Sequence, residues 1–390
     1  MLSAIFFIGS FIYKRYREFI LLIISSPKTA ILVALTTHVF ITQTALADPI
    51  DLDAINRIKV TGYLESYYSH DLYHSSADTR PEFAYSHHVL GKPSVNLAII
   101  KTSYDDDKVR ANLALGSGTY MRANYAQEPD NVQKIYEANF GVKLSRQQQV
   151  WLDAGVMSSH VGFESAIGLH NWTLTRSMMA DNSPYFETGA KLSYSSDDGR
   201  WYASGLIVNG WQRIQRVSGN TSPTIGHQLT FRPNMKWTFN SSSLVGNDQS
   251  DRDRRMRYFH HFYMQYHGEN RWSLIAGFDI GAQQKTRGDD QYDMWFSPIL
   301  IGRYRHSELI SMALRAEYYQ DANGVIVDLQ SPGHEFKTLS YSANLDYVLE
   351  QNINFRVELR KFESKDKIFG EDNDQSRHSL ILTSALIFNF

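Results

Sequence analysis

From residue 57 onward the chain repeats one pattern: segments of about ten residues with alternating apolar and polar side chains, separated by connectors that are short and long in turn. In one unit, Val95, Leu97 and Ile99 share one parity, a turn of three aspartates and a lysine follows, and residues 109–115 resume the alternation. A period of two places these apolar side chains on one face of a strand, which would meet lipid in a membrane barrel. The repetition predicts a series of antiparallel hairpins.

The connectors fall into two classes. Short turns, most of them rich in polar turn-forming residues, are expected at 105–108, 145–149, 196–199, near 233, 268–270, 306–308 and 350–352. Longer polar stretches occupy residues 69–93, 119–133, 157–184, 210–224, 246–255, 283–291, 320–335 and 364–377. Seven turns and eight loops separate sixteen strands, and both ends of the repeat lie on the side of the short turns.

The last segment, Ser379 to Phe390, is itself an apolar strand with an aromatic residue at its end. Left unpaired, such a strand is a template for aggregation. A closed barrel covers it by pairing it with the first strand, around residues 58–68.

These features predict an all-β fold: a transmembrane, antiparallel, up-and-down β-barrel of about sixteen strands with short periplasmic turns and long external loops. A secreted β-sandwich or propeller also has many short strands. The strict alternation of connectors, the absence of a blade-length repeat and the aromatic residues at strand ends, such as Tyr318-Tyr319, favour the membrane barrel. Beyond residue 47, no apolar run approaches the roughly 18 residues of a membrane helix.

The first 47 residues differ from the rest. A long apolar stretch ends at Ala45-Leu46-Ala47, the small-x-small pattern of a cleaved export signal. A second apolar run lies upstream, so residues 1–26 could precede the true start; a retained membrane anchor is the other option. Residues 48–390 then form a single barrel domain. Without the leader's basic residues this domain is mildly acidic, which argues against nucleic-acid binding.

Charged residues occupy the parity opposite the apolar face. Each would cost about 2 to 4 kcal/mol if it faced mid-bilayer lipid, so the charges are expected to line a water-filled lumen. They are Arg110, Glu137, Lys143, Asp153, Glu187, Lys191, Asp279, Arg315, Glu317, Asp346, Arg356, Glu358 and Arg360. Two interpretations remain open: a transverse field that sorts solutes, or charges that simply pair with one another.

Several motifs carry a family resemblance. They are GFESAIG (162–168), NWTLTRS (171–177), NSPYFETGAKLSY (182–194) and NGWQRIQR (209–216), together with GYLESYYSHD near the start and AGFDIGAQQK and LRAEYYQD further on. Over most of residues 57–390 the chain resembles a β-barrel porin family of Gram-negative bacteria. The resemblance implies an outer-membrane channel for passive diffusion of small hydrophilic solutes or ions, without a cofactor.

The same resemblance extends to individual residues and partners. In general porins the third loop folds into the lumen, so residues 157–184 are expected to narrow the channel. Glu164 and Asp181 would form its acidic side, and Arg176 would either be held by carboxylates or serve as a strut. Phe388 and Phe390 resemble the signal read by the barrel-assembly machinery; outer-membrane lipid and, as one option, two further copies in a homotrimer would be the other partners.

An outer-membrane hydrolase of lipid or peptide and an adhesive or structural barrel remain alternatives. Histidines occur at 87–88, 160, 170 and 260–261, but adjacent histidines on a strand point to opposite faces and chelate poorly. Ser158-Ser159-His160 has the residue types of a nucleophile and base without a fixed spacing. The sequence therefore predicts no catalytic residue and no metal site.

Overall fold

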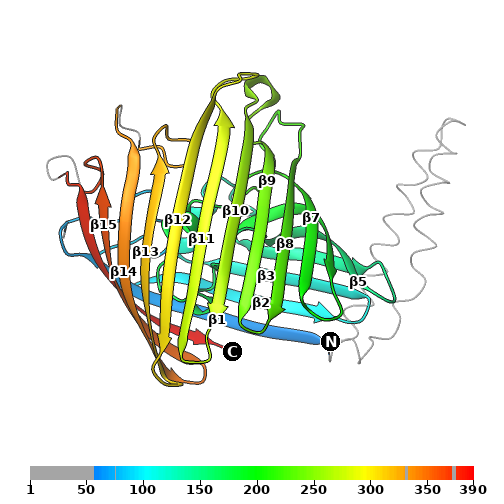
Figure 1. Cartoon of the computed structure of the whole chain (residues 1–390), viewed down its shortest axis with the longest axis horizontal. Helices are drawn as coiled ribbons and strands as arrows, with labels where there is room; N and C mark the ends of the chain where they lie inside the picture. The colour runs from blue at the N-terminus through cyan, green and yellow to red at the C-terminus, as the bar shows by residue number, and fades with distance from the viewer. Residues whose placement is uncertain (1–56, 75, 330–332, 371–374) are drawn as a thin grey trace, which may run out of the picture. The chain divides into compact units, whose positions relative to one another are not determined.

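A computed structural model describes residues 57–74, 76–329, 333–370 and 375–390, and these form one closed barrel (Figure 1). Each strand pairs with its sequence neighbours, and the first pairs with the last. The strands are β1 (Ile58–Asp71), β2 (Ser94–Asp105), β3 (Val109–Ser117), β4 (Ile135–Lys143), β5 (Gln149–Ser158), β6 (Phe186–Ser195), β7 (Trp201–Val208), β8 (Thr224–Asn234), β9 (Trp237–Asn247), β10 (Met256–His267), β11 (Trp272–Gln284), β12 (Tyr292–Arg305), β13 (Ile310–Asp321), β14 (Phe336–Glu350), β15 (Ile353–Ser364) and β16 (His378–Asn389). The expected export signal at residues 1–47 lies outside the described residues.

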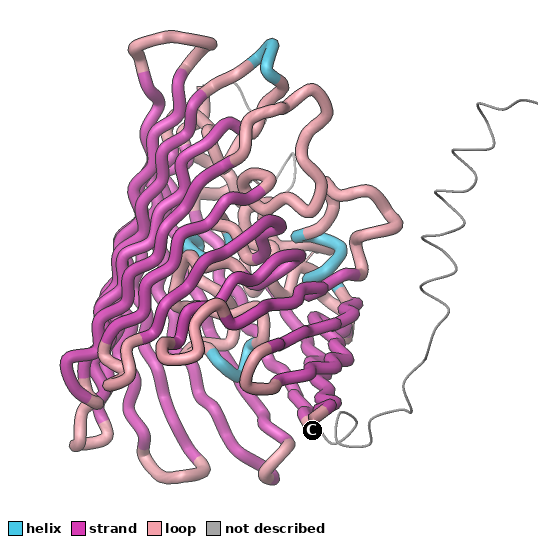
Figure 2. The backbone as a smooth tube through the Cα atoms, turned by 90° about the vertical axis from the view of Figure 1, so that its right-hand side faces the viewer, coloured by secondary structure: helices cyan, strands magenta, loops and turns pink. Residues whose placement is uncertain are grey.

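The sixteen strands and the order of their connectors confirm the predicted fold class. Short turns join the strands at one end of the barrel, called the turn end below, and long loops join them at the other, the loop end. Figure 2 shows the curved wall of magenta strands, with pink loop segments and short helices within its curve.

The seam between β1 and β16 explains the apolar ending of the chain. Leu64 lies opposite Phe388, and at the very end Phe390 and Gly62 exchange two backbone hydrogen bonds of 3.0 and 3.1 Å. A Cβ atom at position 62 would overlap the Phe390 ring, so glycine makes room for the terminal aromatic side chain. The predicted pairing of the last strand with the first is confirmed.

The two faces of the wall differ as the alternation predicts. On β13, Met312 and Leu314 point outward and are 47% and 67% exposed, whereas Arg315 and Glu317 point inward and are buried. A barrel in lipid needs this arrangement, since its outer face meets hydrocarbon.

The assignment of β2 is wrong in one respect. Leu97 and Ile99, predicted to share the outward apolar face, point inward, while Ile100 is 49% exposed on the outside. Ile99 lies opposite Tyr63, whose hydroxyl group bonds the backbone N–H of Gly168 inside the barrel. An apolar cluster covers this part of the inner wall, so the apolar side chains of β2 pack against other apolar side chains inside the barrel and not against water.

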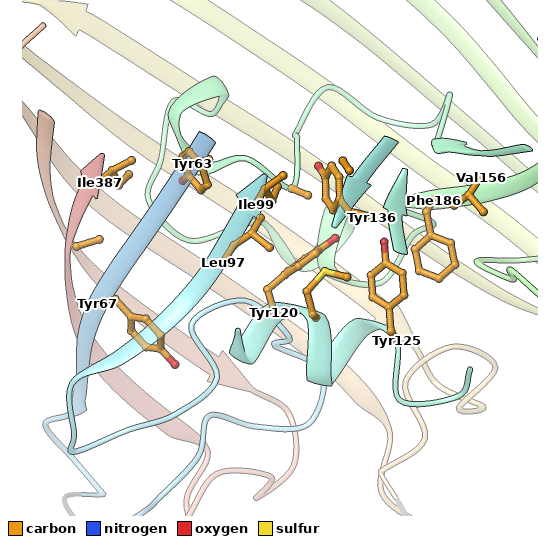
Figure 3. Packing of buried hydrophobic residues seen from close by; sticks show 14 of the residues in the cluster. Tyr63, Tyr67, Leu97, Ile99, Tyr120, Tyr125, Tyr136, Val156, Phe186 and Ile387 are labelled. Atoms are coloured by element: carbon orange, nitrogen blue, oxygen red, sulfur yellow. The ribbon is translucent and has the colours of Figure 1, made fainter. Parts of the chain in front are cut away.

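Part of that cluster comes from the second loop. The helix α4 (Thr119–Asn124) follows β3 and places Tyr120 against the inner wall. Tyr125, the residue after the helix, packs against the same wall. Figure 3 shows these two side chains directed at Tyr136 and Phe186, and the Tyr125 and Phe186 rings stack with centroids 4.2 Å apart. The core therefore lies inside the barrel, between the wall and the loops that enter it.

Three further short helices lie in loops: η1 (Gly168–His170), α5 (Met178–Asp181) and η2 (Asp251–Asp253). Ser177 caps α5, its hydroxyl group accepting the Ala180 N–H at 3.0 Å. Among the described helices, none has both the length and the apolar character needed to cross a membrane.

Candidate functional site

The third loop, residues 159–185 between β5 and β6, lies against the inner face of the opposite wall. Its backbone N–H groups donate to inward-facing side chains: Thr175 to Glu358 at 2.6 Å, Met178 to Glu317 at 2.6 Å and Leu174 to Asn344 at 2.9 Å. These acceptors belong to β13, β14 and β15. A loop without a strand partner must satisfy its backbone groups in this way when it is buried.

Arginines of the same wall bind the loop's carbonyl groups. Arg315 donates to the Thr175 oxygen at 2.7 Å, Arg360 to the Arg176 oxygen at 2.7 Å, and Arg356 to the Gly168 oxygen at 2.6 Å. Two carboxylates and the Asn344 amide oxygen therefore accept N–H groups of the third loop, and arginines bind its carbonyl groups, between residues 168 and 178.

The wall charges also pair with one another. The shortest contacts are 2.6 Å for Arg315 with Glu358, 2.5 Å for Arg360 with Glu317 and 2.6 Å for Arg356 with Asp346. The first four of these side chains and Arg356 are at most 3% exposed. They lie beneath the third loop and do not face open water, and each makes hydrogen bonds to a neighbour or to the loop. This set is called the anchor network below.

Glu164 and Asp181, the expected acidic side of the constriction, are both in the third loop, and both side chains are buried. The Glu164 carboxylate accepts bonds from the Ser177 hydroxyl and N–H groups, and its side chain is 3% exposed. Asp181 is 4% exposed, and its Oδ1 atom has no hydrogen-bond partner among the described residues. Burial raises the pKa of each carboxyl group above its ordinary value.

Arg176 lies between aromatic rings. Its guanidinium carbon is 4.6 Å from the centroids of both Tyr120 and Tyr185, and its Nε atom donates to the Ser165 carbonyl at 2.8 Å. Within the described part of the chain, no carboxylate oxygen lies within 4.0 Å of this guanidinium. The geometry is that of a strut that joins the second and third loops.

Three cavities follow one another on the other side of the third loop. The one at the loop end has a volume of about 280 Å³ and is lined by Asp181, Ser183 and Trp211, among others. The middle one, about 190 Å³, is lined by Ser183, Glu164 and Ser158. The one at the turn end, about 490 Å³, is lined by Ser158 and the walls of β3 to β7. Ser183 and Ser158 are each shared by two cavities, so the three lie end to end.

Several predicted lumen residues line the turn-end cavity. Arg110 and Asp153 form a bidentate pair at 2.7 and 2.6 Å, and Glu137 accepts from Lys101 at 2.5 Å. Lys191 also lines this cavity, and no carboxylate among the described residues lies within 4.0 Å of it. Lys101 also points inward, although it shares the parity of Leu97 and Ile99, which predicts the outward face.

The remaining predicted lumen residues also point inward. Lys143 is half-buried at the turn end of β4, and Asp279 is buried in contact with His261. Glu187 is fully buried and bonds both Ser159 and His160 at 2.9 Å.

The Ser159, His160 and Glu187 group resembles the composition of a hydrolytic triad but not its geometry. His160 uses Nδ1 toward Glu187 and Nε2 toward the Ser243 carbonyl at 2.9 Å, so neither nitrogen is free to take a proton from a serine. Although burial opposes the charged form, Glu187 and the Ser243 carbonyl raise the pKa of His160 above its ordinary value. The group fixes the start of the third loop to β6 and β9.

The other histidines do not gather acids or each other into a metal site. Across the residues that the structure describes, no group of three or more His, Asp or Glu side chains has the arrangement that holds a metal ion.

Residues 57–390 match the family model described as "Putative beta-barrel porin-2, OmpL-like". Similar solved structures include OprB of Pseudomonas putida, with a TM-score of 0.57 and 10% identity over 87% of this chain and 96% of that one. An anion-selective porin from Comamonas acidovorans has a TM-score of 0.56 and 8% identity, over 85% of this chain and 99% of that one. The outer-membrane channel DcaP of Acinetobacter baumannii has a TM-score of 0.54 and 11% identity, over 85% of this chain and 97% of that one. These identities show likeness of fold alone. Comparison with curated protein sequences finds no match.

Proposed function

Since the chain belongs to the "Putative beta-barrel porin-2, OmpL-like" family and is an outer-membrane barrel of porin type, we propose that it forms a water-filled channel for passive diffusion of small hydrophilic solutes or ions. The observation that carries this proposal is the row of three cavities that share Ser183 and Ser158 between the loop end and the turn end. A solute would pass along the β3 to β7 side of the lumen.

The third loop narrows this path in our proposal. The anchor network holds residues 168–178 against β13 to β15, which leaves the opposite side for water. Asp181 faces the loop-end cavity and Glu164 the middle one, so these two carboxyl groups are the acidic side of the constriction. Arg110, Glu137, Asp153 and Lys191 line its turn-end continuation.

Export and assembly complete the proposal. Residues 1–47 act as a cleaved signal, and the C-terminal strand with Phe388 and Phe390 presents the signal for the barrel-assembly machinery. Association into a homotrimer within outer-membrane lipid is proposed by analogy with general porins and is testable by crosslinking in the membrane.

Conductance of the refolded full chain in a planar lipid bilayer tests the channel. Stepwise conductance in KCl is expected, and its consistent absence would reject the proposal. The route has its own test in Ser158→Trp, which places an indole where two cavities meet and should reduce the single-channel conductance several-fold. Ser195→Trp, which lines the turn-end cavity and neither of the other two, is the matched control and should change it little. Equal conductance in the two variants would show that solutes take another route.

A further inference from the structure

A separate cavity of about 280 Å³ lies at the turn end, beneath the third loop on the β10 to β12 side. Trp172 of the loop forms one wall. The other walls carry four basic side chains, one acidic side chain and two small residues: His267, Arg271, Arg303, Arg305, Glu269, Gly268 and Ser273. It is called the arginine cavity below. It shares no lining residue with the three cavities of the proposed path.

Two of its three arginines, Arg303 and Arg305, lie on β12, and Arg271 lies in the turn before β11, where its guanidinium donates to the His306 carbonyl at 2.9 Å. Arg305 donates its backbone N–H to the Arg271 carbonyl at 2.9 Å, so these two residues face one another across β11 and β12. Arg303 is two residues along the same inward face of β12. Like charges opposite one another on paired strands are destabilising unless something of opposite charge is near.

None of the three forms an ion pair within the described part of the chain. No carboxylate oxygen there lies within 4.0 Å of the three guanidinium groups. The nearby acids have other partners: Glu269 pairs with Lys236 at 2.8 Å, and Asp346 with Arg356 at 2.6 Å. Arg303 donates one bond, to Ser311 at 2.9 Å, and its Nε atom is buried without a partner. The cavity thus offers donors and positive charge to a ligand.

Beside the paired charges of the turn-end cavity, the surrounding lumen carries further cations. Lys143, Lys191 and Arg232 also point inward in the half of the barrel nearer the turn end, and among the described residues none of them has a carboxylate within 4.0 Å. A cleft lined by one sign of charge raises the local concentration of the opposite ion. The cations without a carboxylate partner therefore favour the approach of anions to this mouth.

Trp172 adds an apolar surface. Its ring meets His267 edge-on, with centroids 5.8 Å apart, and its other side packs with Met179, Ile275 and Ile301. Packing fixes the indole in place, and the part of it that is exposed, 8% of the residue, lies beside the charges. Aromatic rings pair favourably at such walls, and guanidinium groups bind carboxylates through two parallel hydrogen bonds.

We propose that the arginine cavity binds small organic anions in which a carboxylate is joined to a flat apolar body. The carboxylate lies between Arg303 and Arg305, and the flat body lies against Trp172. This inference names a solute class for the proposed channel. It rests on the proposed function only in one respect, which is the placement of the cavity at the periplasmic entrance.

Calorimetric titration of the detergent-solubilised full chain tests the site, with benzoate, acetate and benzylammonium as probes. Benzoate should bind, acetate about tenfold more weakly, and benzylammonium without measurable heat. Arg303→Gln with Arg305→Gln should weaken benzoate binding at least about tenfold. Trp172→Leu should weaken benzoate while leaving acetate unchanged.

The control removes two cations from other turns on the same rim, Arg146→Gln with Arg200→Gln, and should leave benzoate affinity unaltered. Circular dichroism and single-channel conductance in KCl report whether each variant is folded and open; if the double variant does not fold, Arg305→Gln alone replaces it. Benzoate binding that is equal in the arginine variants and the wild type overturns the inference. Channels without benzoate binding refute the site alone, whereas benzoate binding without channels refutes the proposed function alone.

Discussion

Glu358→Gln should loosen the third loop without opening the barrel wall. The Glu358 carboxylate accepts the Thr175 N–H at 2.6 Å and pairs with Arg315 at 2.6 Å, and the residue is 1% exposed. Removing one partner of a buried pair costs about 3 to 5 kcal/mol, because the other charge is left buried. Glutamine keeps an oxygen for Thr175, and Glu317 is still 3.2 Å from Arg315, so the lower end of that range applies.

About 3 kcal/mol corresponds to a factor of more than a hundred in an equilibrium constant. If the cost falls on the docked state of the loop, single-channel records of the variant should show frequent brief openings of higher conductance that the wild type shows rarely. The strand ladder is untouched, so the β-sheet circular dichroism spectrum should be retained.

Glu363→Gln is the matched control, because it makes the same change on the same strand. Glu363 pairs with Lys361 at 2.5 Å in a partly exposed position, where ion pairs contribute little. If both variants fold and Glu358→Gln shows brief high-conductance openings no more often than Glu363→Gln, the assignment of Glu358 to loop anchoring is refuted.

Three further outcomes are expected. The pKa of His160 is raised, so its contribution to loop anchoring is complete below the ordinary value of about 6.5 and is lost as the pH rises through the higher folded-state value; channel noise should increase there, and His160→Gln should remove that pH dependence. Glu164→Gln with Asp181→Asn should shift the reversal potential in a salt gradient toward anion selectivity. The shift should be larger at alkaline pH, because burial raises both pKa values; an unchanged potential would reject the acidic constriction. Deleting Phe390 should reduce the inserted fraction more than the conductance of inserted channels, since the residue closes the seam at Gly62; heat-modifiability on gels measures insertion.

Most of the fold could be predicted because its signals are local. A period of two defines each strand, turn residues end it, and the order of turns and loops sets the topology. The error at Leu97 and Ile99 shows the limit of this reasoning. Apolar side chains usually mark the lipid face, but here the tyrosines that follow β3 cover the inner wall and reverse the assignment.

The candidate site was less predictable. Parity placed the charges of β13 to β15 on the inner face, and the observed strands agree. Parity says nothing about which of them meet water. Arg356 bonds Gly168 and Arg315 bonds Thr175, contacts that span 188 and 140 residues of sequence. The sequence does not single out Arg303 and Arg305, because charges at the turn end look alike until their partners are known.

The sequence by itself determined the number of strands, their order and the seam at Phe390, because hydrophobic alternation and turn chemistry act over a few residues. Only the tertiary structure decided which charges anchor the third loop, which line cavities and which are left without a partner. Those outcomes depend on which side chains accept and donate the backbone hydrogen bonds of the buried third loop. These side chains lie on strands more than a hundred residues away in the sequence.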